Sequence, residues 1–335
     1  MKILKRISAL LLALLMILPF AACDNGTGTN ESTTGEPETE STTSYIRETK
    51  TKIAALNGTT GLGVAKIKMS RAYAYEVTYC NSPEEITALI TEGKTDLATL
   101  PITYACELYK STEGKIKILA VNGLGILHVI ENGKSITDIS SLSGKTVYAS
   151  GKGTATEYIL NYVFSENGVN ANIKYVDDQN ELYSLAAEGK ANICILPEPL
   201  ASTAVMNNGD LRYALNISEE WSKISETPLA QSVIVARSEY IDQNPEYIEK
   251  FLSHNETSVN YLKLNLGAGT ENMLVNEGHF DNHTLANFVV TGSNLYFMKG
   301  EEMKAALENV IGILFEANPD FVGGEIPDGG IYYIG

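Results

Sequence analysis

A repeat with an offset of 96 residues limits the folds available to this chain more than any other feature. Residues 85–101 and 181–197 share a leading Glu, an internal Leu, a Glu-Gly-Lys triplet and a terminal Leu-Pro pair. Each copy predicts an amphipathic helix, a stop with Gly at the helix C-cap, and a buried strand that ends in Pro. The alternative is a chance coincidence of two generic helix–strand units. The repeat predicts two similar α/β units within one chain.

A strand-turn-helix segment opens each unit. Residues 52–56 predict a buried strand, the Asn-Gly-Thr-Thr-Gly segment 57–61 predicts a turn, and a helical pattern follows from Leu62. The same offset leads to 145–157, where a strand, a Gly/Thr turn and the start of a helix recur. Such a turn places backbone N–H groups and hydroxyls at the positive end of a helix, which suits an anion or a polar ligand. The alternative is a plain strand-to-helix turn, and the glycine spacing matches neither a dinucleotide fingerprint nor a P-loop.

The first 22 residues have the pattern of an export signal. Lys2, Lys5 and Arg6 precede an apolar segment, 9–20, that is too short for an ordinary membrane span. Small residues then lead to Cys23 in a pattern that resembles the cleavage site of a bacterial lipoprotein. We expect cleavage before Cys23 and lipidation of its thiol, with an ordinary secretory signal as the alternative. Either way, the sequence predicts an extracytoplasmic protein.

Residues 23–44 predict a disordered tether, because they are rich in Thr, Ser, Gly and Glu and have no apolar period. A lipid on Cys23 would then hold the following domain at a cell membrane. The formal net charge is −16, and removal of residues 1–22 takes away three cations and no acids. An acidic surface of this kind argues against nucleic acid as a partner.

The remaining cysteines specify no complete disulfide framework. Cys80, Cys106 and Cys194 form an odd set. Cys106 and Cys194 lie in apolar runs and are expected to be small buried hydrophobic residues. Whether Cys80 and Cys106 form a disulfide is left open by the sequence.

The order of predicted strands and helices indicates a nested arrangement. We expect residues 45–123 and 235–335 to form the first lobe, completed by C-terminal helices, and 124–234 to form a second lobe inserted into it. Two chain crossings, near 122–126 and 232–236, would make a hinge.

Several of these segments together resemble the substrate-binding proteins of ABC importers that have the type-2 periplasmic fold. Within these, the chain is similar to the group that binds sulfonates, nitrate and thiamine-precursor pyrimidines. The resemblance is carried by segments 54–61, 96–101, 118–125, 142–146, 196–199 and 318–328. It implies a Venus-flytrap α/β protein that closes two lobes on a small molecule and docks on an ABC permease with its ATPase. It also implies a monomer without enzymatic activity or cofactor.

The predicted ligand-binding residues lie where strands end and helices begin. Two sets come from the opening turns, and a third follows the Leu-Pro strand ends: Asn57, Thr59 and Thr60; Ser150, Gly151, Gly153 and Thr154; Ile102, Thr103 and Glu198. For the hydroxyls of the turns, helix capping is the alternative role. A Glu198 that faces the cleft would oppose an anion and favour an aminopyrimidine or an ammonium group. A surface or hinge carboxylate is the alternative for this residue.

The sequence gives little support for metal binding or catalysis. His279 and His283 have helical i, i+4 spacing but lack further metal ligands, so we predict no metal site. No nucleophile elbow or catalytic triad is present. An enzyme on the same fold would need a general base in the cleft, for which Glu198 is the charged candidate. A surface receptor without a transport role is a further alternative. Because no Arg falls at the predicted site, a vitamin-precursor ring is favoured slightly over a sulfonate or nitrate.

Overall fold

The computed structural model describes residues 50–69 and 75–335. The predicted export signal (1–22), the lipidation site Cys23 and the tether (23–44) lie outside these residues. No described helix is both long and apolar enough to cross a bilayer.

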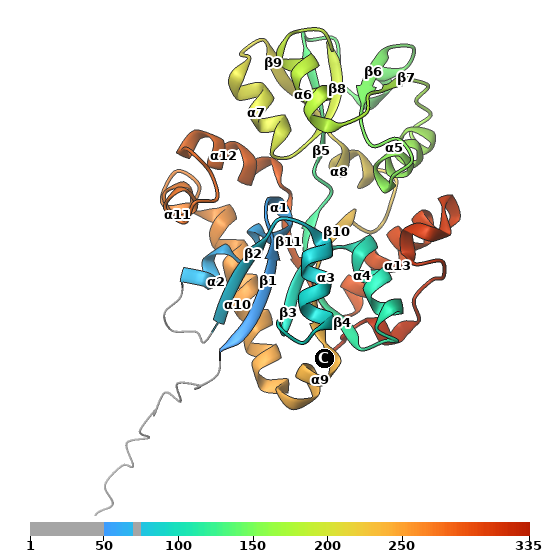
Figure 1. Cartoon of the computed structure of the whole chain (residues 1–335). Coiled ribbons are helices and arrows are strands. Elements are labelled where there is room, and N and C mark those ends of the chain that lie inside the picture. Colours follow the sequence, from blue (N-terminus) through green and yellow to red (C-terminus); the bar gives the residue numbers. More distant parts are fainter. Residues whose placement is uncertain (1–49, 70–74) are drawn as a thin grey trace, which may run out of the picture. The chain divides into compact units, whose positions relative to one another are not determined.

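The strands form two sheets, and the second is inserted into the first (Figure 1). The first sheet has the order β11-β4-β10-β3-β1-β2, and the second has the order β7-β6-β8-β5-β9. The strands of the first sheet are β1 Thr51–Leu56, β2 Tyr75–Cys80, β3 Leu97–Pro101, β4 Ile116–Leu124, β10 Ala230–Arg237 and β11 Leu295–Met298. Those of the second are β5 Leu127–Asn132, β6 Thr146–Ala149, β7 Asn172–Tyr175, β8 Ile193–Pro197 and β9 Leu211–Asn216.

Helices cover both faces of each sheet. They are α1 Thr59–Leu62, α2 Ala65–Met69, α3 Pro83–Thr91, α4 Ile102–Ser111, α5 Ala155–Glu166, α6 Gln179–Ala187, α7 Leu200–Asn207, α8 Ile217–Trp221, α9 Ser238–Gln243, α10 Pro245–Leu264, α11 Thr270–Asn276, α12 His283–Gly292 and α13 Gly300–Ala317. Short 3₁₀ turns occur at Ile139–Leu142, Pro319–Val322 and Gly329–Ile331. This is the inserted α/β arrangement that the sequence predicts.

The period of two along a strand divides the core of the first sheet between its faces. Ile53 and Ala55 of β1 join the cluster of α10, whereas Ala54 joins the cluster of α3, α4 and α13. Both β1 and β3 are nearly continuous apolar runs, as expected for parallel strands covered on two faces.

The two copies of the repeat adopt the same local structure. Helices α3 and α6 are followed, at the same offset, by strands β3 and β8, which both end in Pro. Gly93 and Gly189 have φ values of 69° and 70°, so each stop uses the left-handed conformation that glycine tolerates.

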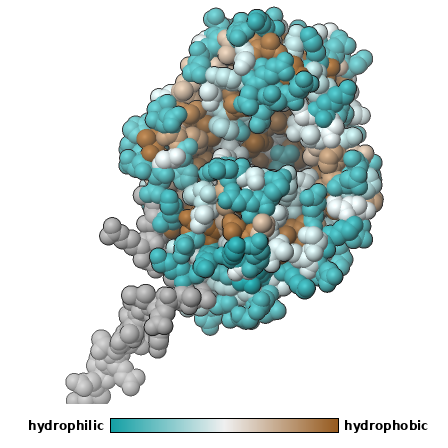
Figure 2. Space-filling view, in the orientation of Figure 1, coloured by the Kyte–Doolittle hydropathy of each residue, from teal (hydrophilic) through white to brown (hydrophobic). Residues whose placement is uncertain are grey.

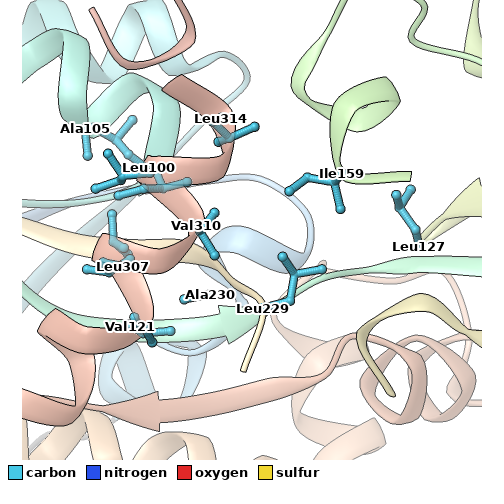
Figure 3. Close-up of a cluster of buried hydrophobic side chains, with 14 of the residues drawn as sticks. Leu100, Ala105, Val121, Leu127, Ile159, Leu229, Ala230, Leu307, Val310 and Leu314 are labelled. Carbon is cyan, nitrogen blue, oxygen red and sulfur yellow. The ribbon is translucent and has the colours of Figure 1, made fainter. Parts of the chain in front are cut away.

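One hydrophobic cluster runs across both sheets. It joins Leu100 and Val121 of the first sheet to Val129 of the second, through helices α5 and α13. Figure 3 shows that Ile159 of α5 lies across from Val310 and Leu314 of α13, and that Leu127 and Leu229 lie next to Ile159. The apolar packing is therefore continuous between the two sheets.

One expectation about local structure needs correction, and one open question is answered. The C-terminal part is not wholly helical, because Leu295–Met298 forms β11 and pairs antiparallel with β4 at the sheet edge. The three cysteines of the described chain are free and buried, so Cys80 and Cys106 do not form a bridge.

Candidate functional site

A cavity of about 190 Å³ lies where β1 and β3 end and α1 and α4 begin; we call it the central cavity. Thr59 and Thr60 of α1 line it together with Ile102 and Thr103 of α4. Apolar side chains from α5 and α13 form the opposite wall. Figure 2 shows hydrophobic residues gathered in the hollow between the upper and lower parts of the described chain. The carboxyl edge of an open parallel sheet is where α/β proteins commonly bind ligands.

Four polar side chains in this cavity have no hydrogen-bond partner among the described residues. They are the hydroxyls of Thr59, Thr60 and Thr103 and the amide of Gln231 at the start of β10. Ser232, by contrast, donates to the side-chain oxygen of Asn122 over 2.6 Å. Unpaired polar groups around an apolar hollow are the arrangement that orients a small ligand.

The helix starts at the central cavity also leave backbone donors free of side-chain caps. The N-cap residues of α1 and α4 are Gly58 and Pro101, and neither provides a capping side chain. Asn57 instead donates from its amide to Asn81 over 2.8 Å and is exposed. Helix capping, the alternative role for the first turn, is therefore not what Asn57, Thr59 and Thr60 do here.

A second cavity, of about 340 Å³, lies at the carboxyl ends of β6 and β8. Ser150 and Gly151 line it, and it shares Ile126 and Gln231 with the central cavity. Asp177 and Asp178, which follow β7, also line it, and Asp178 caps the first turn of α6. The two opening turns of the repeat thus contribute to adjoining cavities.

A third, wider groove of about 790 Å³ extends from Thr103 along α3 and α4 to the start of α5. Thr154 lines this groove, but its hydroxyl caps α5 by accepting from the N–H of Thr156 over 3.3 Å. Gly153 lines none of the three cavities, and its N–H donates to Glu157. In the second turn, Thr154 therefore fits the alternative role of helix capping better than the predicted role of ligand binding.

The lining of these three cavities is acidic or neutral. It contains the carboxylates of Glu84, Glu92, Glu107, Asp177 and Asp178. In this part of the described chain, no Lys, Arg or His side chain lines any of the three. A strongly anionic ligand would meet no cation here.

Glu198 lies away from the three cavities. Its side chain is fully buried, and its carboxylate accepts from the hydroxyls of Ser202 and Tyr213, each over 2.6 Å. Burial raises the pKa of Glu198, although these hydrogen bonds oppose the rise. Burial also lowers the pKa of His128, whose Nε2 lies 3.7 Å from the carboxylate. The expectation that Glu198 opposes a ligand in the cleft thus needs correction, because two hydroxyls turn its side chain inward.

Sequence reasoning missed Gln231 and the apolar wall made by Ile159, Val310 and Leu314. Gln231 stands beside the predicted crossing, where it and Ser232 are polar residues ahead of an apolar run, which is a signal that could have been used. The α13 residues have only the periodicity of a core helix, so their position at the cavity could not be predicted from the pattern.

Metal chemistry gains no support from the described residues, which contain no group of three His, Cys, Asp or Glu side chains able to hold an ion. His279 instead packs edge-on against the ring of Tyr79, with 4.7 Å between ring centroids.

Comparison with known proteins gives a family and a fold. Residues 76–265 match the model of the family described as NMT1/THI5 like. No curated protein matches the chain. Among solved structures, an ABC transporter protein of Parabacteroides distasonis is 22% identical, with a TM-score of 0.73 over 85% of this chain and 99% of that one.

Two further structures share the fold at lower identity. The periplasmic aliphatic sulphonate binding protein SsuA of Escherichia coli is 13% identical, with a TM-score of 0.62 over 82% of this chain and 94% of that one. The ligand-binding component of an ABC-type import system of Staphylococcus aureus, solved with zinc bound, is 14% identical, with a TM-score of 0.59 over 85% and 98%. The predicted fold, that of a type-2 periplasmic binding protein, is confirmed.

Proposed function

The chain belongs to the NMT1/THI5-like family, and from this premise we propose that it is an extracytoplasmic solute-binding protein that delivers a small molecule to an ABC importer. Its two sheets would be the cores of two lobes, 45–123 with 235–335 and 124–234. Its partners would be a permease and an ATPase, and it would act as a monomer held at the membrane through a lipid on Cys23.

The observation that carries this proposal is the set of unpaired polar side chains around the apolar central cavity. Thr59, Thr60, Thr103 and Gln231 come from three separate segments of the first sheet and its helices. All four side chains are half-buried, so their hydroxyl and amide groups stay open to a molecule that enters the cavity. A ligand with a ring or a short apolar body and several hydrogen-bonding atoms would satisfy these groups.

The charge of the lining narrows the ligand class. Five carboxylates and no cation line the three adjoining cavities within the described residues. A sulfonate or a nitrate would lose its hydration and gain only backbone N–H groups at the starts of α1 and α4, with no charged partner, which is costly. We therefore favour an uncharged or cationic ligand, such as a pyrimidine-like vitamin precursor, over the sulfonate class.

An enzymatic role is not proposed. The charged residue that sequence reasoning offered as a general base, Glu198, has its carboxylate buried against Ser202 and Tyr213. A general base must come within hydrogen-bond reach of the proton that it removes.

A thermal-shift panel tests the proposal. The purified protein is heated with aminopyrimidines, thiamine, riboflavin, taurine, alkyl sulfonates and nitrate, and with butylamine and butanesulfonate as a matched pair. A ligand at 100 times its dissociation constant should stabilise the folded state by about 2.7 kcal/mol. The shift should be lost in Thr60→Val and kept in Thr257→Val, which changes an exposed threonine on α10.

The other outcomes separate the alternatives. Stabilisation by butanesulfonate or nitrate would contradict the proposed charge of the ligand but leave the binding role intact. Turnover of a panel member without stabilisation would favour an enzyme. Neither stabilisation nor turnover would mean that the ligand belongs to none of the classes in the panel and would contradict the proposed pyrimidine-like ligand.

A further inference from the structure

A buried polar cluster joins three elements of the second sheet region. It comprises His128 of β5, Glu198 and Ser202 at the start of α7, and Tyr213 of β9. His128, Glu198 and Ser202 are 4%, 3% and 0% exposed. Besides the two hydrogen bonds to Glu198, the hydroxyls of Ser202 and Tyr213 lie 2.7 Å apart. The cluster has its own hydrogen-bond network, and no function described above uses it.

This cluster contacts helix α12, which leads into the first sheet. The Nε2 of His128 donates to the carbonyl oxygen of Gly292, the last residue of α12, over 2.8 Å. A Cβ atom placed on Gly292 would lie 2.2 Å from Oε1 of Glu198 and 2.8 Å from its Cδ. Because Ser202 and Tyr213 hold that carboxylate, it cannot turn away without breaking their bonds. Glycine is therefore the residue that this approach of α12 to α7 permits.

A second contact lies two residues beyond Gly292. The amide of Asn294 faces the amide of Asn216, the last residue of β9, with N–O distances of 2.9 and 3.2 Å in the two directions. Asn294 also donates to the carbonyl of Gly125, and its own carbonyl accepts from the N–H of Leu124 over 3.0 Å. Gly125 lies between β4 and β5, where the chain passes from the first sheet to the second.

The central cavity borders this contact directly. Ser293, between Gly292 and Asn294, lines the cavity, as do Leu124 and Ile126 on either side of Gly125. A change in the distance between α12 and the second sheet would therefore move one wall of the cavity.

We propose that His128, Glu198, Gly292, Asn216 and Asn294 form a clasp that holds the second sheet against the end of α12 and sets the width of the central cavity at its Ser293 wall. The clasp adds a non-covalent connection to the covalent crossings between the two sheets. It gives Glu198 a positioning role in place of a direct role in ligand binding. It does not depend on which ligand the cavity takes.

Hydrogen–deuterium exchange of the full chain tests the clasp. In Gly292→Ala, exchange should become about tenfold faster in peptides that cover Ser293–Leu295 and also in those that cover Tyr213–Ile217, because both sides of the contact open. Peptides from the first half of β4, residues 116–120, which pair with β10, should keep their wild-type rates. The matched control is Gly312→Ala, a helical glycine of α13 whose added Cβ would meet no atom within 4 Å.

A double variant distinguishes loss of the clasp from a local defect of α12 that Gly292→Ala could cause by itself. Glu198→Ala removes the group that the new methyl would strike, so Gly292→Ala combined with Glu198→Ala should exchange no faster than Glu198→Ala alone. The proposal is wrong if Gly292→Ala changes exchange only within α12. It is also wrong if the two substitutions add without interaction, or if Gly312→Ala gives the same pattern.

Discussion

At the scale of the residue, Glu131 shows how this chain stabilises a buried charge. Its side chain is 2% exposed and lies 2.6 Å from Nη2 of Arg212. Ser135 donates to it from both its N–H and its hydroxyl, and the N–H of Ile136 donates as well. Burial alone would raise the pKa of Glu131, but these hydrogen bonds outweigh burial and lower it. The carboxylate therefore stabilises the loop that follows β5.

We predict that Glu131→Gln loses about 2 kcal/mol of unfolding free energy, because a carboxylate with charge-assisted bonds is replaced by a neutral amide beside Arg212. Urea denaturation at pH 7 measures the loss. The control Glu188→Gln removes an exposed partner of Lys190 and should change stability by less than about 0.5 kcal/mol. Equal losses in the two variants would contradict this account.

The same residue predicts a pH dependence with a definite sign. The pKa of Glu131 is lower in the folded state than its ordinary value of 4.5. Its stabilisation is thus fully present above that value and is lost as the pH falls through the lowered folded pKa. The stability difference between wild type and Glu131→Gln should shrink on acidification below about pH 4.5. A difference that stays constant down to pH 3 would show that the charge is not responsible.

At the scale of the element, α1 depends on a close approach between backbones. A Cβ atom on Gly61 would lie 2.2 Å from the carbonyl oxygen of Leu56 and 3.2 Å from the Cβ of Ala55. The helix that carries Thr59 and Thr60 therefore rests directly on the end of β1. This contact explains why the opening turn of the first unit needs a glycine there.

We predict that Gly61→Ala costs about 1–3 kcal/mol, since the backbone of β1 cannot yield as a flexible side chain would. It should also weaken the binding of any ligand found in the thermal-shift panel, because α1, which lines the central cavity, must shift relative to β1. The matched control is Gly209→Ala, whose added Cβ would meet nothing within 4 Å. Wild-type stability and affinity in Gly61→Ala would refute the proposed contact.

At the scale of the whole molecule, the shared hydrophobic cluster links the folding of the two sheets. Leu100 of the first sheet and Val129 of the second belong to the same cluster. Trp221, the single tryptophan, is fully buried in that cluster and donates from its indole N–H to the carbonyl of Thr227 over 2.8 Å. It precedes the crossing back to β10, so it reports on the second sheet region.

We predict that denaturant unfolding followed by Trp221 fluorescence coincides with unfolding followed by far-UV circular dichroism. A single shared midpoint is expected, because neither sheet can lose its part of the cluster without exposing the other. Fluorescence that changes at lower denaturant than circular dichroism would mean that the second sheet region unfolds on its own.

The sequence by itself determined the elements whose signals are local. The 96-residue repeat predicted α3–β3 and α6–β8, with Gly93 and Gly189 at their stops. Strand-end and helix-start chemistry also predicted Thr59, Thr60, Ile102 and Thr103, which the fold brings to one cavity. The two helix–strand units are confirmed, because periodicity, turn residues and caps depend on neighbours in the chain; a role of the four cavity residues in ligand binding stays a prediction.

Only the tertiary structure decided where distant segments meet. The side chain of Glu198 points inward because its carboxylate accepts hydrogen bonds from the hydroxyls of Ser202 and Tyr213. Gly292 of α12 lies close to the same carboxylate. Gln231 and Leu314 reached the cavity from segments far along the chain from Thr59. No local pattern encodes such contacts, because they depend on how amphipathic elements share a common core, and many residues can satisfy that requirement.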